Sequence, residues 1–144
     1  MGRMIFVNLP TRDLAAADAF YAAMGFEKNA SFSNEDASSW MVSPEIWIMS
    51  LSEAYFGGFL RGGDKPLFGG GGQQMLNALS CSSIGEVDEL TRTAAAHGGA
   101  VYRDPKSDFP GMYGSAVTDP DGHVWELVWM EQPGDGTPTE ESGE

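Results

Sequence analysis

The sequence is poor in cysteine, in basic residues and in long apolar runs, and each shortage excludes a class of protein. Its one cysteine, Cys81, cannot form an internal disulfide, which is typical of a reducing compartment. Eight Lys and Arg stand against 21 Asp and Glu, giving a formal net charge of −13. This charge argues against nucleic acid or an anionic membrane as partner, because both are bound through basic patches. No apolar run is long enough to cross a bilayer, and none at the N-terminus is typical of a signal peptide, so we expect a cytoplasmic protein.

The acidic residues are dense at the C-terminal end of the sequence. Residues 131–144 read EQPGDGTPTEESGE and hold five acids with no Lys or Arg. Almost nothing in this stretch is apolar, so it predicts a disordered, solubilising tail. Residues 1–130 have the length of one domain with a sizeable core.

Residues 3–56 show the pattern of a strand, a helix and three further strands. An apolar run at 4–10 predicts the first strand. Thr11 is expected to cap the following helix, whose apolar positions keep helical spacing up to Gly25. Further strands are predicted near 26–33, 38–43 and 45–51.

Residues 74–130 repeat this order. A strand is predicted at 75–81, and Ser83 with Glu86 has the spacing of a capping box for the helix that follows. Gly98 or Gly99 is expected to end that helix. Further strands are predicted near 100–104, 111–118 and 123–130.

The duplicated order βαβββ predicts an α+β fold of two modules, about 3–56 and 74–130, joined by a linker at about 57–73. Units of this size bury little surface alone. We therefore expect the two modules to share one core, with a curved mixed sheet around a common cleft. The glycine run at 69–72 is interpreted as a flexible connector, since no Lys-Ser/Thr follows it as in a phosphate loop.

Three segments carry a family resemblance: FVNLPTRDLAAADAFYAAMGF at 6–26, ALSCSSIGEVDEL at 78–90 and DPDGHVWEL at 119–127. On these segments the chain resembles the vicinal oxygen chelate superfamily, which includes glyoxalase I, bleomycin-resistance proteins and extradiol dioxygenases. The motifs FVNLP, WIMSL, GMYGSAV and DGHVWELVWM are similar to a subgroup of predicted glyoxalase-related proteins of unknown substrate. The resemblance implies the duplicated fold and a homodimer.

In metal-dependent members of this superfamily, four strand positions hold the ion. The resemblance places these positions at Phe6, Met49, Leu76 and Glu126. Phe and Leu have no donor atom, and a Met thioether suits the harder divalent ions poorly. One carboxylate cannot hold Zn²⁺, Ni²⁺ or Fe²⁺ tightly, and the nearby Asn8 adds only a weak oxygen ligand. We therefore predict neither a metal site nor another cofactor.

The two histidines do not complete a metal site. His97 is interpreted as a cap at a helix end. His123 follows the DPDG sequence at 119–122, which predicts a type I turn with structural Asp residues. His123 is expected to flank this turn at the surface and to share a strand face with Trp125, whereas Glu126 lies on the other face.

Glu126 is the candidate catalytic residue, and three roles are open for it. It could be a relic that hydrogen-bonds cleft neighbours such as Asn8. It could act as a general acid or base in an apolar cleft. It could also anchor a cationic or hydroxylated ligand.

The side chains around Glu126 predict a cleft for a small organic molecule. Its rim is expected to include Trp47 and either Met112 or Tyr113, depending on strand phase. The predicted ligand-binding residues are Phe6, Asn8, Trp47, Met49, Leu76 and Tyr113. Alternatively, the side chains fill the cleft and the chain is an interaction protein without a ligand.

Two functions follow for an open cleft. The first is a metal-free protein that sequesters a small molecule, as drug-resistance proteins do, with the acidic surface attracting a cationic drug. The alternative is a lyase, isomerase or dioxygenase of the glyoxalase type that uses Glu126 as metal ligand or general base. Ala116 stands where the resemblance places the tyrosine of a dioxygenase, which argues against that activity.

Overall fold

A computed structural model of the chain describes residues 2–132. The predicted acidic tail lies outside the described residues from position 133 onward. Both modules of the duplicated order are within the described part. None of the helices in residues 2–132 is long and apolar enough to cross a membrane.

The first module contains four strands and a helix that covers them, followed by a short helix. Its elements are β1 (Ile5–Thr11), α1 (Leu14–Ala23), β2 (Glu27–Lys28), the 3₁₀ helix η1 (Ala30–Phe32), β3 (Ala37–Ser43), β4 (Ile46–Ser52) and α2 (Glu53–Gly57). The second module repeats this order from the linker onward. Its elements are β5 (Leu76–Ser80), α3 (Ile84–Ala96), β6 (Ala100–Lys106), β7 (Met112–Thr118) and β8 (Val124–Met130).

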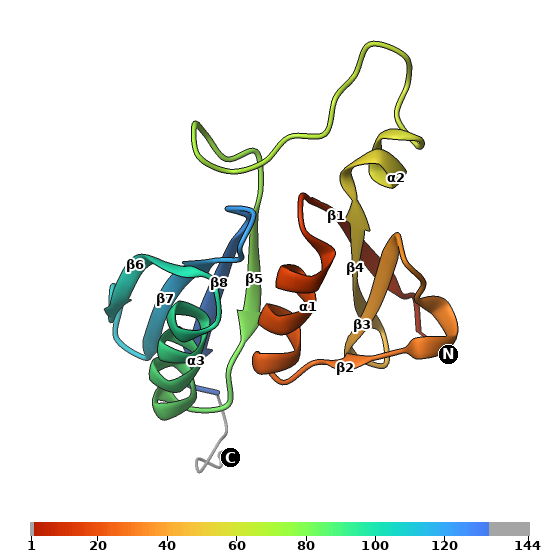
Figure 1. The fold of residues 1–144 in the computed structure, drawn as a ribbon. Coiled ribbons are helices and arrows are strands. Elements are labelled where there is room, and N and C mark those ends of the chain that lie inside the picture. Colours follow the sequence, from red (N-terminus) through yellow and green to blue (C-terminus); the bar gives the residue numbers. More distant parts are fainter. Residues whose placement is uncertain (1, 133–144) are drawn as a thin grey trace.

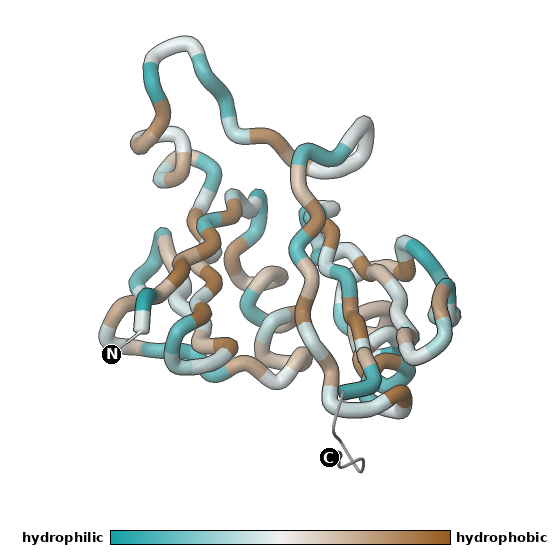
Figure 2. Tube along the Cα trace, turned by 180° about the vertical axis from the view of Figure 1, so that it is seen from behind, coloured by the Kyte–Doolittle hydropathy of each residue, from teal (hydrophilic) through white to brown (hydrophobic). Residues whose placement is uncertain are grey.

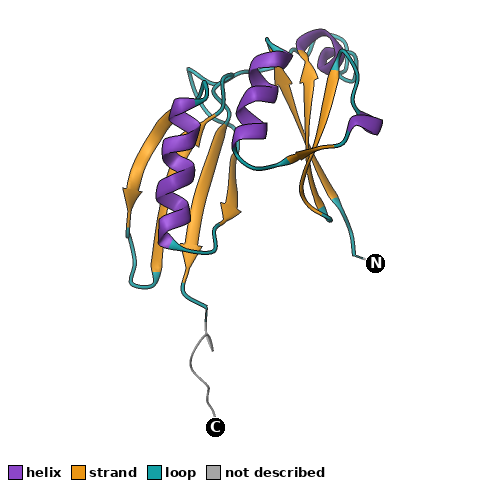
Figure 3. Ribbon diagram, turned by 60° about the horizontal axis from the view of Figure 1, so that its bottom comes forward, coloured by secondary structure: helices purple, strands orange, loops and turns teal. Residues whose placement is uncertain are grey.

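The two modules form two four-stranded sheets of the same topology. The strand orders are β1-β4-β3-β2 and β5-β8-β7-β6, and in each sheet the first pair is parallel and the others antiparallel. Figures 1 and 3 show the sheets side by side, with α1 and α3 each packed on one sheet. The α+β fold of two βαβββ modules is thus confirmed. Its strands divide between two sheets, in which β1 and β5 are edge strands.

Asp13, and not Thr11, caps α1, so that prediction was wrong. The Asp13 carboxylate accepts a hydrogen bond from the backbone N–H of Ala16 at 3.1 Å, and its charge suits the positive end of the helix. Thr11 remains in β1, where its hydroxyl bonds both the N–H and the carbonyl of Asp13. Thr11 therefore turns the chain toward the helix instead of capping it.

The other helix ends follow the prediction. Ser83 caps α3 by accepting a hydrogen bond from the N–H of Glu86 at 3.0 Å. The Glu86 carboxylate accepts from the N–H of Ser82 at 2.6 Å, one residue before the cap. Gly25 and Gly98 follow α1 and α3 with φ of 96° and 95°, a conformation that ends a helix and favours glycine.

The strand predicted near 26–33 is mostly absent. Only Glu27 and Lys28 pair with β3, and the chain then forms the 3₁₀ turn of η1. The Asn29 side chain accepts from the N–H of Ser31 at 3.0 Å, and the Ser33 hydroxyl donates to the carbonyl of Asn29 at 2.7 Å. These local bonds compete with strand pairing and explain the difference.

One hydrophobic core joins the two modules. It contains Ala17, Phe20 and Tyr21 from α1, and β8 contributes Trp125 and Leu127. The core also includes Trp40 and Ile48 from the first sheet with Val87, Ala94 and Val117 from the second module. Cys81 also belongs to the core, and burial raises the pKa of its thiol to about 11. The thiol is a packing residue, as expected.

A hydrogen-bonded network crosses this core. The buried Tyr21 hydroxyl donates to Asp119 Oδ2 at 2.6 Å and accepts from Trp125 Nε1 at 3.0 Å. The other oxygen of Asp119 accepts from the N–H groups of Asp121 and His123, both at 2.9 Å. Burial raises the pKa of Asp119, an effect that His123 and the Tyr21 hydrogen bond partly offset. The network binds α1 to the turn before β8.

The DPDG segment forms the predicted turn, with the Gly122 N–H bonded to the Asp119 carbonyl at 3.0 Å. Its Asp residues are structural, since Asp121 Oδ1 accepts from the Arg12 N–H at 3.0 Å. His123 is half-buried, and not a free surface residue as expected: its Nε2 donates to the Pro10 carbonyl at 2.9 Å. Both contacts join the turn to the end of β1.

Tyr21→Phe tests how much the network stabilises the fold. The variant leaves Asp119 Oδ2 and the Trp125 N–H buried without their partner, so we expect a loss of about 1–3 kcal/mol in the free energy of unfolding. Urea unfolding followed by far-UV circular dichroism measures this loss. Tyr55→Phe, at an exposed tyrosine of α2, is the matched control and should change nothing. Equal stabilities of the two variants would contradict the role given to the network.

Candidate functional site

Each sheet leaves one face uncovered by its helix, and most of the predicted cleft residues lie on these faces. In the first sheet, Phe6 and Asn8 on β1 lie beside Trp47 and Met49 on β4. The rings of Phe6 and Trp47 stack with their centroids 6.4 Å apart, and 49% of Phe6 is exposed. Figure 2, seen from the side opposite to Figure 1, shows apolar residues along the strands of both sheets. The uncovered face of the first sheet is thus aromatic and apolar.

The strand registers decide which residues lie level with one another. Asn8 is opposite Met49 in the first sheet, and Ala78 is opposite Glu126 in the second. Asn8 and Ala78 are equivalent, because each stands five positions before the N-cap of the next helix (13 − 8 and 83 − 78). The four equivalent positions are therefore Asn8, Met49, Ala78 and Glu126.

Two of the predicted positions, Phe6 and Leu76, lie two residues earlier in their strands than Asn8 and Ala78. Phe6 is opposite Trp47, and Leu76 is opposite Val124, with 54% of Leu76 exposed. Both still point to the same face as Asn8 and Ala78, since side chains alternate along a strand. They belong to the faces around the site but do not stand level with Glu126.

Glu126 is paired with an arginine that the sequence reasoning did not consider. Arg103 Nη2 on β6 donates to Glu126 Oε2 at 3.0 Å. The two side chains reach each other across β7, where Ala116 stands opposite both residues. They are partly exposed, at 36% for Arg103 and 27% for Glu126. An arginine on the next strand but one was the available signal, but the β-bulges on either side of Arg103 made its face impossible to assign from the sequence.

Strand phase places Met112, and not Tyr113, on the face of Glu126. Met112 is opposite Met130, which alternation puts on the same side of β8 as Glu126. Tyr113 faces α3, and its hydroxyl donates to Asp88 Oδ1 at 2.6 Å. This hydrogen bond raises the pKa of Tyr113. Tyr113 therefore stands apart from the other predicted ligand-binding residues.

The histidines lie away from Glu126, each in a structural contact. His97 caps the end of α3, and its Nδ1 is 2.9 Å from the Thr93 carbonyl oxygen, as the cap interpretation predicts. His123 stacks on Phe68 of the linker with ring centroids 6.1 Å apart. Phe68 in turn carries the Arg12 guanidinium 3.7 Å above its ring centre. His123 thus holds the linker against the turn.

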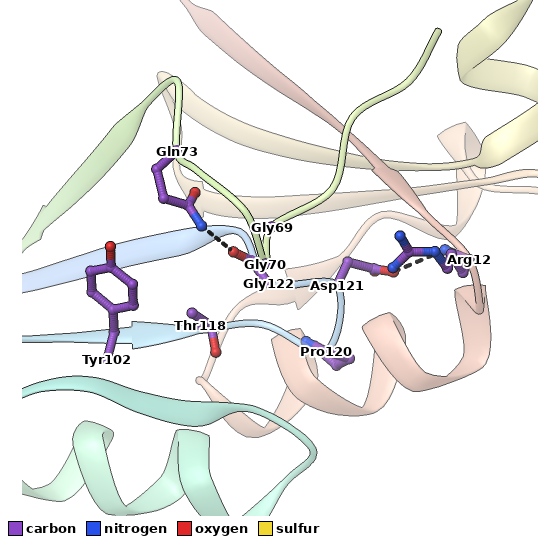
Figure 4. Close-up of a pocket in the computed structure, with 9 residues that line it drawn as sticks. All are labelled: Arg12, Gly69, Gly70, Gln73, Tyr102, Thr118, Pro120, Asp121 and Gly122. Carbon is purple, nitrogen blue, oxygen red and sulfur yellow. Dashed lines mark hydrogen bonds between the residues drawn. The ribbon is translucent and has the colours of Figure 1, made fainter.

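Two pockets border the strands, and neither is lined by Glu126. The first, of about 360 Å³, lies between the linker and the turn before β8 (Figure 4). There Gln73 Nε2 donates to the Gly122 carbonyl at 3.0 Å. A Cβ on Gly69 would overlap that carbonyl, so this glycine is required for close packing and is not merely a flexible connector.

The second pocket, of about 330 Å³, lies on the uncovered face of the first sheet beneath α2. Apolar side chains and one amide line it: Asn8, Leu51, Phe56, Phe59 and Leu60. Of the predicted ligand-binding residues, this pocket contains Asn8. Its chemistry suits an apolar molecule with one hydrogen-bonding group.

The comparisons with known proteins agree with this duplicated architecture. A family model described as Glyoxalase/Bleomycin resistance protein/Dioxygenase superfamily matches residues 3–127. The chain belongs to this superfamily. No curated protein matches the chain.

Solved structures share the fold at low sequence identity. A glyoxalase-related enzyme from Fulvimarina pelagi is 22% identical with a TM-score of 0.77, covering 99% of this chain and 100% of that one. A lactoylglutathione lyase from Agrobacterium tumefaciens is 21% identical with a TM-score of 0.63, covering 90% and 94%. The bleomycin resistance determinant encoded on transposon Tn5 is 19% identical with a TM-score of 0.59, covering 91% and 100%. These likenesses show the fold of this chain. Its chemistry has to be argued from its own site residues.

The donors at the four equivalent positions do not fit a divalent metal. They offer one carboxylate, one amide, one thioether and one methyl group, and the carboxylate is held by a guanidinium. Within residues 2–132, no group of three or more His, Cys, Asp or Glu is arranged so that it could hold a metal ion. Tight sites for Zn²⁺ and similar ions need three or four such ligands.

Metal titration tests this conclusion directly. We expect Zn²⁺, Ni²⁺ and Fe²⁺ to leave the melting temperature of the superfamily member unchanged, since no ligand set stabilises the folded state. Native mass spectrometry of the untagged protein should show no stoichiometric metal. A bound metal that raises the melting temperature and that Glu126→Gln loses would show that Glu126 is a ligand after all.

Proposed function

We propose that this protein binds a small organic molecule on the uncovered sheet faces without using a metal ion. The proposal rests on the four equivalent positions Asn8, Met49, Ala78 and Glu126. They include one carboxylate, and that carboxylate forms an ion pair with Arg103. A duplicated scaffold with apolar faces and few polar groups suits binding of an organic ligand better than metal chemistry. The single buried thiol agrees with a cytoplasmic location.

The first sheet supplies the apolar part of the proposed site. Phe6 and Trp47 offer a stacked aromatic surface, and Met49 adds an adaptable thioether next to Asn8. The pocket beneath α2 continues this surface through Asn8. The second sheet supplies the polar part through Glu126 and Arg103.

The pairing of Glu126 changes what it recognises. A cationic drug would have to displace the Arg103 guanidinium, which already balances the carboxylate. A hydroxylated or polar ligand can instead bond both groups at once. The relic role with Asn8 is not favoured, because Glu126 accepts its hydrogen bond from Arg103 and the Asn8 amide donates to the Phe6 carbonyl at 3.3 Å.

Ligand titration by NMR tests the binding function. We expect small aromatic amides such as benzamide to shift the backbone signals of Phe6, Asn8 and Met49, and Phe6→Ala to weaken binding about tenfold, which equals ~1.4 kcal/mol. Phe32→Ala, at an exposed aromatic of η1, is the control and should bind normally. Shifts confined to other surfaces would contradict the proposal.

Glu126→Gln separates this function from its rival. A lyase or isomerase of the glyoxalase type remains the second candidate, because Glu126 is a partly exposed carboxylate on an open face. In an enzyme the substitution should abolish turnover, whereas in a binding protein it should only alter affinity. Turnover of any substrate that Glu126→Gln abolishes would favour the enzyme.

We also propose that the protein acts as a homodimer. The edge strands β1 and β5 are equivalent by duplication, and both expose large apolar side chains. They are Met4, Ile5 and Phe6 at β1, and Met75 and Leu76 at β5. In a two-fold pair, the first module of one copy can meet the second module of the other, which covers both edges and completes the cleft.

Sedimentation velocity measures this assembly. Leu76→Lys places a charge at the proposed interface, so we expect its dimer to dissociate at concentrations where the unmodified protein remains paired. Leu67→Lys, at a linker residue that is 73% exposed, is the control and should sediment like the unmodified protein. A monomeric unmodified protein would overturn the proposal.

A further inference from the structure

A row of four residues crosses the second sheet on its uncovered face. Arg103 on β6 stands opposite Ala116 on β7, which stands opposite Glu126 on β8, which stands opposite Ala78 on β5. Both neighbours of Glu126 in this row end at a methyl group. The ion pair therefore covers Ala116, which is 1% exposed, and a ligand can approach the pair from the open face above it.

The Arg103 guanidinium has more donors than its partner uses. A guanidinium presents five N–H donors in a planar fork. Among residues 2–132, the structure records one hydrogen bond from this side chain, from Nη2 to Glu126 Oε2. The side chain is 36% exposed, so the remaining donors can be reached from the open face. An arginine fork binds planar oxyanions through two parallel hydrogen bonds.

Glu126 fixes the orientation of this fork. Exposed ion pairs contribute little to stability, so the pair is poorly explained as a stabilising contact. A carboxylate that holds one edge of the guanidinium does, however, reduce the freedom of the long arginine side chain. The exposed edge of the guanidinium is then held toward the open face of the sheet, where a ligand would lie.

We propose that Arg103 binds the carboxylate of a small organic acid, and that Glu126 positions the guanidinium for it. This inference rests on the proposed binding function and names its ligand class: an apolar body for the sheet faces and one carboxylate for Arg103. The apolar neighbours on the same face of the sheet are Met112, Val128 and Met130. Glu126 is thus a positioning residue, and the Arg103 guanidinium is the group that binds the ligand.

The overall charge of the protein makes a preference for a carboxylate over its neutral amide informative. A formal charge of −13 repels small anions from most of the surface. A carboxylate that binds more tightly than its neutral amide must therefore be held by a local cation. Arg103 is that cation on the proposed face.

The test compares benzoate with benzamide on the full chain, because the two differ in charge but hardly in shape. We expect benzoate to bind about tenfold more tightly and to shift the Arg103 side-chain N–H signal with the backbone signals of Ala78 and Ala116. Arg103→Gln should remove the preference for benzoate while benzamide still binds. Lys106→Gln, which removes an exposed cation from the same strand, is the matched control and should keep the preference.

Two further outcomes separate the inference from the proposed function. Glu126→Gln frees the guanidinium of its charged partner, so benzoate should bind at least as tightly but with broadened Arg103 signals. If benzoate and benzamide bind equally well in the unmodified protein, the carboxylate site is overturned while the binding function stands. If neither compound shifts signals on the sheet faces, both proposals fail.

Discussion

The arrangement of the two modules depends on the two hydrogen bonds made by the Tyr21 hydroxyl. This hydroxyl lies in the core, donates to Asp119 and accepts from Trp125, so one side chain of α1 holds both the DPDG turn and the strand after it. Arg12 and Pro10 add backbone bonds to the same turn. Because the polar groups of Tyr21, Asp119 and Trp125 are buried, leaving any of them unpaired would be costly. The DPDG turn therefore connects the two modules, and these contacts fix the position at which β8 begins.

The position of β8 explains why an acid can stand within an apolar strand. Trp125 and Leu127 point into the core, whereas Glu126 points to the uncovered face, where it meets Arg103. The carboxylate thus avoids the cost of burial without a partner. The same alternation leaves the face around it apolar or small. On the scaffold of this superfamily, the chain therefore carries an arginine beside the one carboxylate of its four equivalent positions.

Much of this could be read from the sequence, because it depends on local patterns. The duplication, the Ser83 cap and the turn at 119–122 follow from spacing and turn chemistry. The Asp13 cap was missed because Thr11, two residues earlier, has an equally suitable side chain. Register and bulges are properties of strand pairs. For this reason the sequence could not predict that Asn8 lies opposite Met49. It also could not predict which face Tyr113 occupies, or that Arg103 approaches Glu126.

The central claim is that Arg103 is paired with Glu126, so that this carboxylate is not available as a ligand to a divalent metal ion. A crystal structure of the protein soaked in excess Zn²⁺, with anomalous diffraction recorded at the zinc edge, tests this claim most directly. The account predicts no anomalous peak within bonding distance of Glu126 and an intact contact between Arg103 and Glu126. A zinc peak bonded to the Glu126 carboxylate, with Arg103 displaced, would contradict it.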